Sequence, residues 1–158
     1  MVRAREGYIA PEATPPVLHT TVSTGVRFAP AIAEVLDHPI ENPAVPMWVT
    51  AKAGASSGRD ADVIVTADMD AAAVGEPDAE IELGAVAVNA AGTVVRAQRE
   101  RFQPSAARSG ADGAPLRVSR AMTISLPPGH YQLRVAAGNT GSTRAGSVLY
   151  DLDIPQPR

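Results

Sequence analysis

The chain has 158 residues and a mass of 16.3 kDa, which suits one domain with its own core and is short for two. Its composition, 45% hydrophobic and 20% charged, is that of a folded globular protein. A net charge of −3 argues against a nucleic-acid-binding module, because such modules carry a basic face. The lack of cysteine excludes thiol catalysis, disulfides and cysteine-ligated metals.

The N-terminal part of the sequence is polar and rich in proline. It contains neither the apolar run of a secretory signal nor that of a membrane span, so no membrane insertion is predicted. Pro11, Pro15 and Pro16 favour an extended linker. The β-branched segment from Val17 to Phe28 predicts a strand that pairs at a sheet edge, within its own chain or with a neighbouring copy.

A single helix of about two turns is predicted from Pro30 to His38. Proline suits the first helical turn, and the apolar side chains at positions 32, 35 and 36 recur at helical spacing. The proline at position 39 ends the run. Because so short a helix is marginal in isolation, we expect it to pack on the rest of the chain.

The remainder of the chain predicts a series of antiparallel strands without helices between them. The strands are expected over residues 47–53, 62–69, 81–89, 93–102, 116–126, 130–137 and 148–154. A glycine-rich stretch, residues 54–58, is expected to break the first strand, and residues 104–115 form a polar loop. Arg120 interrupts an apolar row and indicates either a bulge or an arginine whose stem leaves the core.

The last three strands alternate apolar and polar residues with a period of two, which predicts one buried face for each. The inward row is expected to contain Val63, Val65, Met122, Ile124, Leu133, Val135, Val148 and Tyr150. Tyr131 follows two prolines and a glycine at a strand start, as in the tyrosine corner of immunoglobulin-like domains. The predicted fold is therefore an all-β, immunoglobulin-like or fibronectin type III-like antiparallel sandwich of about seven strands, with one short helix near the N-terminus.

Several stretches resemble the C-terminal region of bacterial proteins with a von Willebrand factor A-related domain, of the type found in Acidobacteria. The stretches are LPPGHYQLRVAA at residues 126–137, RAGSVLYDLDIP at 144–155, VRAREGYIAP at 2–11, VPMWVTA at 45–51 and AVNAAG at 87–92. The resemblance implies three parts: residues 1–28 as a linker or edge segment from an upstream module, residues 29–44 as a short helix and connection, and residues 45–155 as the sandwich. It also implies an exported parent protein, located outside the cell, on its surface or in the periplasm.

The chain departs from this family in two respects. It lacks the Asp-x-Ser-x-Ser motif with which von Willebrand factor A domains bind a metal, so the resemblance carries no metal-dependent adhesion to these residues. The segment from Val17 to Phe28 also differs from the family pattern.

The sequence offers few groups for catalysis or metal binding. His19, His38 and His130 are not at metal-ligand spacing, and exposed or capping roles are expected for them. Asp68 and Asp70 share one side of a strand and are the best candidates for calcium, although a solvated strand face is the simpler interpretation. The same choice applies to the pairs at positions 80 and 82 and at 151 and 153. Trp48 is expected to anchor a core or a sheet face rather than stack on sugar.

We therefore assign no catalytic, cofactor or metal residue from the sequence, and the leading prediction is a non-enzymatic module with a structural or protein-interaction role. Its partner would be a protein, bound through loops or through an unpaired sheet edge, and self-association through such an edge is open. One alternative is a carbohydrate-binding or calcium-dependent adhesion module. A second is a subunit that donates a strand during assembly.

Overall fold

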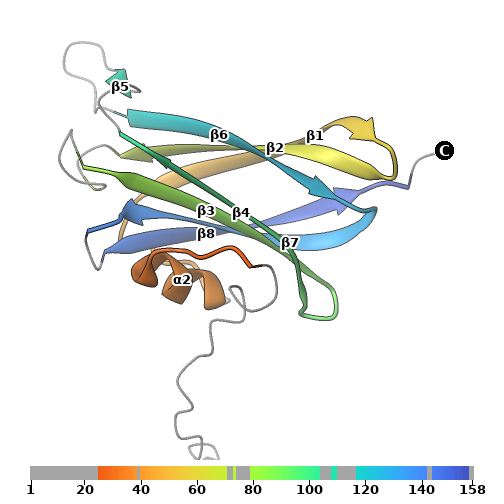
Figure 1. Ribbon diagram of the computed structural model, residues 1–158, viewed down its shortest axis with the longest axis horizontal. Helices are drawn as coiled ribbons and strands as arrows, with labels where there is room; N and C mark the ends of the chain where they lie inside the picture. Colours follow the sequence, from red (N-terminus) through yellow and green to blue (C-terminus); the bar gives the residue numbers. More distant parts are fainter. Residues whose placement is uncertain are drawn as a thin grey trace, which may run out of the picture.

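Two antiparallel sheets packed face to face form the body of the protein in this computed structural model (Figure 1). The structure describes residues 25–38, 40–70, 73, 79–103, 108–109, 117–141 and 144–156. The first sheet contains β1 (Met47–Ser57), β2 (Asp60–Asp70), β6 (Arg117–Leu126) and β5 (Arg108–Ser109), in the order β1-β2-β6-β5. The second contains β4 (Val94–Phe102), β3 (Ile81–Asn89), β7 (Gly129–Asn139) and β8 (Ala145–Ile154), in the order β4-β3-β7-β8.

This order identifies the class of fold. When the strands are lettered along the chain, the sheets are ABED and C′CFG, the arrangement of immunoglobulin-like and fibronectin type III-like sandwiches. The predicted fold class is confirmed, with the two-residue β5 added to the seven long strands. The helix is also confirmed as α2 (Pro30–Asp37).

The structure corrects one local prediction about the strands and decides between two alternatives at another position. The predicted break at residues 54–58 is wrong, because β1 continues to Ser57 through a register shift between Ala53 and Ser56. Arg120 is not a bulge, since it pairs with Ala67 in unbroken register. Its guanidinium instead leaves the inner row and meets the other sheet, where Nε donates to Glu100 at 2.8 Å.

Most of the predicted inward row lies in the core between the sheets. Six of its eight members are buried, whereas Val148 and Tyr150 on the outer strand β8 are half-buried against the same cluster. The register of β7 is therefore as predicted. Of the predicted strand from Val17 to Phe28, residues 17–24 lie outside the described part of the chain, and residues 25–28 run without a strand into α2.

A second apolar cluster covers the outer face of the β4-β3-β7-β8 sheet. Phe28 and the buried face of α2 (Ile32, Ala33 and Leu36) pack there on small side chains of β3, β7 and β8. Gly84 of β3 makes room for this layer, because a Cβ at that position would lie 2.7 Å from Cε1 of Phe28. As a result β3 is buried on both of its faces, as central strands of parallel sheets usually are.

Glu82 fastens this layer to the sheet. Its carboxylate is fully buried and accepts hydrogen bonds from the Ala29 N–H at 2.6 Å and from Arg101 Nε at 2.8 Å. The N-terminus of α2 lacks a side-chain cap of its own, so this distant carboxylate fixes where the helix begins. The interpretation of Glu80 and Glu82 as a solvated pair is wrong for Glu82 and holds for the exposed Glu80.

Replacement of Glu82 by alanine is expected to cost about 2 kcal/mol, because the buried Ala29 N–H loses its acceptor. Glu82→Gln keeps an acceptor oxygen and should cost about half as much. Glu80→Ala removes an exposed carboxylate on the same strand end and should stay within about 0.5 kcal/mol of wild type. Urea denaturation gives the three values, and equal losses for Glu80→Ala and Glu82→Ala would contradict the anchoring role.

The tyrosine corner is present as the sequence predicts. Tyr131 is 4% exposed and its hydroxyl donates to the Pro127 carbonyl oxygen at 2.8 Å. Burial of the ring raises the pKa of the hydroxyl above its usual value. The bond ties the start of β7 to the loop that precedes it.

Tyr131→Phe should lower the free energy of unfolding by about 1 kcal/mol, since it removes the hydrogen bond and keeps the ring. Tyr131→Ala should cost about 3 kcal/mol or more, because a cavity is added to that loss. Chemical denaturation measures both. An unchanged denaturation midpoint of Tyr131→Ala would show that the tyrosine corner does not stabilise the fold.

Candidate functional site

The connection from α2 to β1 crosses the edge of the second sheet. Residues 40–46, here called the strap, lie along β8, where the Ser147 N–H donates to the Asn42 carbonyl at 2.8 Å. The Asn42 N–H donates back to Ser147, and the Leu149 N–H donates to Glu41 Oε1 at 3.1 Å. At its far end the Pro46 carbonyl accepts from Asp70 N–H of β2. The strap thus covers part of one sheet's edge and reaches the other sheet.

The strap can lie close to β8 because the residue of β8 that faces it is a glycine, which has no side chain. Gly146 lies on the inner row of β8, and a Cβ at that position would lie 2.5 Å from the Val45 carbonyl oxygen. Val45 is buried in the main core, so the end of the strap enters the sandwich. The Asn42 side chain adds a local turn by accepting from the Ala44 N–H at 2.9 Å.

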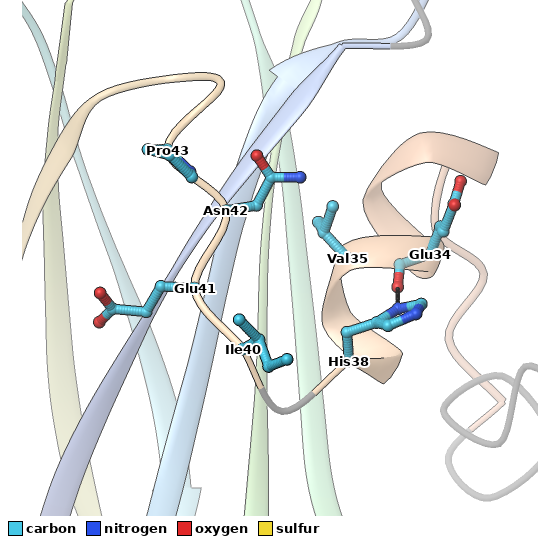
Figure 2. A pocket seen from close by; sticks show the side chains of 7 residues that line it. All are labelled: Glu34, Val35, His38, Ile40, Glu41, Asn42 and Pro43. Atoms are coloured by element: carbon cyan, nitrogen blue, oxygen red, sulfur yellow. Dashed lines mark hydrogen bonds between the residues drawn. The ribbon is translucent and has the colours of Figure 1, made fainter. Parts of the chain in front are cut away.

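A groove of about 310 Å³ separates the strap from the C-terminal half of α2 (Figure 2). In Figure 2 the Val35 and Ile40 side chains lie between Glu34 on the helix and Glu41 on the strap. The His38 ring closes one end, and its Nδ1 donates to the Glu34 carbonyl at 2.7 Å. The lining residues are Glu34, Val35, His38, Ile40, Glu41, Asn42 and Pro43.

A second hollow of about 240 Å³ lies on the other side of the same strap. It is bounded by the strap, by the start of β1 with Met47 and Trp48, and by Ser147 and Val148 of β8. Glu41, Asn42 and Pro43 line both hollows, so the two form one surface folded around the strap. We call this the strap surface.

The strap surface presents two large apolar side chains to solvent. Ile40 is 70% exposed and Trp48 is 52% exposed. The guanidinium of Arg117 lies 4.1 Å from the centroid of the Trp48 ring, which restricts the ring by a cation–π contact. Such exposure on both sides of a hollowed surface is typical of an interaction site, whereas single exposed apolar residues on a flat face are ordinary. The sequence predicts Trp48 in a core or on a sheet face, and its side chain lies on the outer face of β1.

The candidate calcium pair, Asp68 and Asp70, lies on the outer face of the first sheet. Asp68 accepts a hydrogen bond from Ser119 of β6, and Asp70 is the partner of Arg117 in the register of the sheet. Within the residues that the structure describes, no group of three or more histidine or carboxylate side chains could hold a metal ion. Asp68 and Asp70 thus lie beside polar residues of β6, and the calcium interpretation stays a prediction.

The two described histidines lie at the ends of elements. His19 lies outside the described residues. His38 follows α2, and His130 at the start of β7 bonds Asp153 of β8 at 2.6 Å. This hydrogen bond, and then the charge of Asp153, raise the pKa of His130 above its usual 6.5.

The His130–Asp153 pair gives a pH-dependent prediction. Because the folded-state pKa is raised, any stabilisation by the pair is fully present below the unfolded pKa and is lost as pH rises through the folded one. An NMR titration should place the His130 midpoint above 6.5, and Asp153→Asn should move it back toward that value. Identical midpoints in the two proteins would show that the pair does not form in solution.

Comparison with known proteins yields similarity in fold only. No family model matches the chain, and no curated protein matches it. Among solved structures, a putative β-galactosidase from Bacteroides fragilis is 18% identical with a TM-score of 0.46 over 68% of this chain and 16% of that one. The C-terminal domain of Wzt is 13% identical with a TM-score of 0.40 over 78% of this chain and 86% of that one.

A third structure, a calcium-binding mutant of Bacteroides uniformis β-glucuronidase 2, is 11% identical with a TM-score of 0.44, over 68% of this chain and 13% of that one. This chain therefore spans less than a fifth of either of the two enzymes. The protein is a β-sandwich module. None of its described helices is both long and apolar enough to cross a membrane.

Proposed function

We propose that this chain is a non-enzymatic protein-interaction module and that it binds its partner through the strap surface. The observation that carries the proposal is the pair of exposed apolar side chains, Ile40 and Trp48, on either side of a strap bordered by two hollows. Burial of such side chains by a partner is favourable at roughly 25 cal/mol per Å² of apolar surface removed from water. Interfaces place aromatic residues of this kind in their centres.

The surroundings of the polar side chains support a role without catalysis. The hydroxyls of Ser119 and Ser125 bond to Asp68 and Asp62 across neighbouring strands, which is a structural arrangement. The two described histidines contact a backbone carbonyl and an aspartate rather than a hydroxyl nucleophile.

The wider setting of the module is part of the same proposal. The resemblance of residues 126–137 and 144–155 to von Willebrand factor A-related proteins supports a bacterial parent that is exported and carries this module downstream of another domain. The sequence that precedes Met1 in the parent gene tests this part. A von Willebrand factor A-like domain there would support it, and a different domain would overturn it.

The interaction surface is tested with immobilised protein and its variants. Ile40→Ser and Trp48→Ser should each reduce the retention of a specific binding protein by roughly tenfold, as expected for contact residues at the centre of an interface. Ile64→Ser is the matched control, because Ile64 is an apolar residue 47% exposed on β2, outside the strap surface. Equal thermal midpoints of the variants exclude unfolding as the cause.

A glycan array with and without calcium separates this function from the alternative of a carbohydrate-binding module. If the chain is a protein-interaction module, no glycan on the array should bind in a calcium-dependent way that Trp48→Ser abolishes. Such binding, or protein retention that Ile64→Ser reduces as much as Ile40→Ser, would contradict it.

A further inference from the structure

The carboxylates among the described residues that line the groove between α2 and the strap belong to Glu34 and Glu41, and His38 also lines it. Glu34 stands on the helix and Glu41 on the strap, with the apolar side chains of Val35 and Ile40 between them (Figure 2). Neither lysine nor arginine is among the described residues that line this groove. The groove therefore has apolar side chains at its centre and one glutamate on each side, with the two carboxylates directed outward (Figure 2).

Two arginines bind backbone oxygens of the helix and the strap. Arg134 donates to the Leu36 carbonyl at 3.1 Å, where it satisfies the C-terminal end of α2. Arg144 donates to the Ala44 carbonyl at 2.8 Å. Both guanidinium groups bind backbone oxygens, and neither arginine is among the described residues that line the groove.

We propose that the groove binds a peptide segment of another protein in which a bulky apolar side chain is flanked by arginine or lysine. This inference rests on the proposed function and specifies the partner. The apolar side chain would contact Val35 and Ile40, and the flanking cations would pair with Glu34 and Glu41. A volume of about 310 Å³ is at the lower end of ligand pockets, about 300–1,000 Å³, and leaves space for a short anchor rather than a large ligand.

A hydrogen bond within the protein fixes the position of the Glu41 carboxylate. Its Oε1 accepts from the Leu149 N–H at 3.1 Å, which fixes the carboxylate at the edge of β8. A carboxylate accepts several hydrogen bonds at once, so a cation of the partner can be added without breaking this one. Glutamine at this position keeps the acceptor oxygen and removes only the charge, which makes Glu41→Gln a conservative test.

The test uses three fluorescein-labelled peptides and the full chain. The peptide SGRLKLRGS is basic and apolar, SGELELEGS reverses the charges, and SGRSKSRGS removes the apolar anchors. Fluorescence anisotropy should give a Kd for the first that is about tenfold lower than for either other peptide. The double variant Glu34→Gln/Glu41→Gln should bind the first peptide roughly fivefold to tenfold more weakly, and Ile40→Ser should also weaken it.

Two controls isolate the charge effect. Asp153→Asn removes an exposed carboxylate from the other end of β8 and should leave the affinity unchanged. Raising the salt from about 0.05 M to about 0.5 M should reduce the difference between wild type and the double variant, because surface charge pairs are screened.

Four results would overturn the inference. They are equal binding of the acidic and basic peptides, an unaffected double variant, no binding of any of the three peptides, and a concentration-dependent dimer that Ile40→Ser dissociates. The last would make a second copy of this chain the occupant. If a binding protein is still retained through Ile40 and Trp48, the proposed function stands and only the partner chemistry is wrong.

Discussion

The arrangement of the whole molecule depends on the outer face of the β4-β3-β7-β8 sheet being apolar. Val86 and Val88 of β3 and Ala136 of β7 point away from the core between the sheets and require a cover. The helix α2 supplies it, and the buried carboxylate of Glu82 fixes the point at which the helix starts. Since an eight-residue helix has little stability of its own, this packing and this hydrogen bond account for its presence.

The strap surface is a consequence of this cover. The helix lies on the outside of one sheet, whereas β1 belongs to the other, so the chain between them must pass around the edge formed by β8. The groove is the space between a helix that must follow the sheet and a connection that must leave it (Figure 2). Ile40 is exposed because its segment turns away from the helix before it pairs with β8 at Asn42.

The sequence predicts the parts of this structure that depend on local periodicity. Period-two alternation identifies the strands, the prolines bound the helix, and the residues before Tyr131 indicate the corner. Contacts between distant residues escape such reasoning. Glu82 resembles a solvent-facing residue of an alternating strand, and only the position of Ala29, far from it in sequence, shows why it is buried. The position of the strap could not be predicted either, because Asn42 and Ser147, which pair there, are 105 residues apart in the sequence.

Three of the sheet edges carry features that disfavour strand addition, which supports the proposal that a partner binds through side chains of the groove. β4 carries Arg96, Arg99, Glu100 and Arg101, and charged edges disfavour pairing with another strand. The first half of β8 is covered by the strap, and its second half presents Asp151 and Asp153. On β1, the Tyr150 hydroxyl of β8 donates to the Ala51 carbonyl at 3.5 Å and so connects the two sheets at that edge. With three edges charged, covered or tied, the strap surface is where apolar side chains remain exposed beside glutamates, and it is the surface that we propose for a partner.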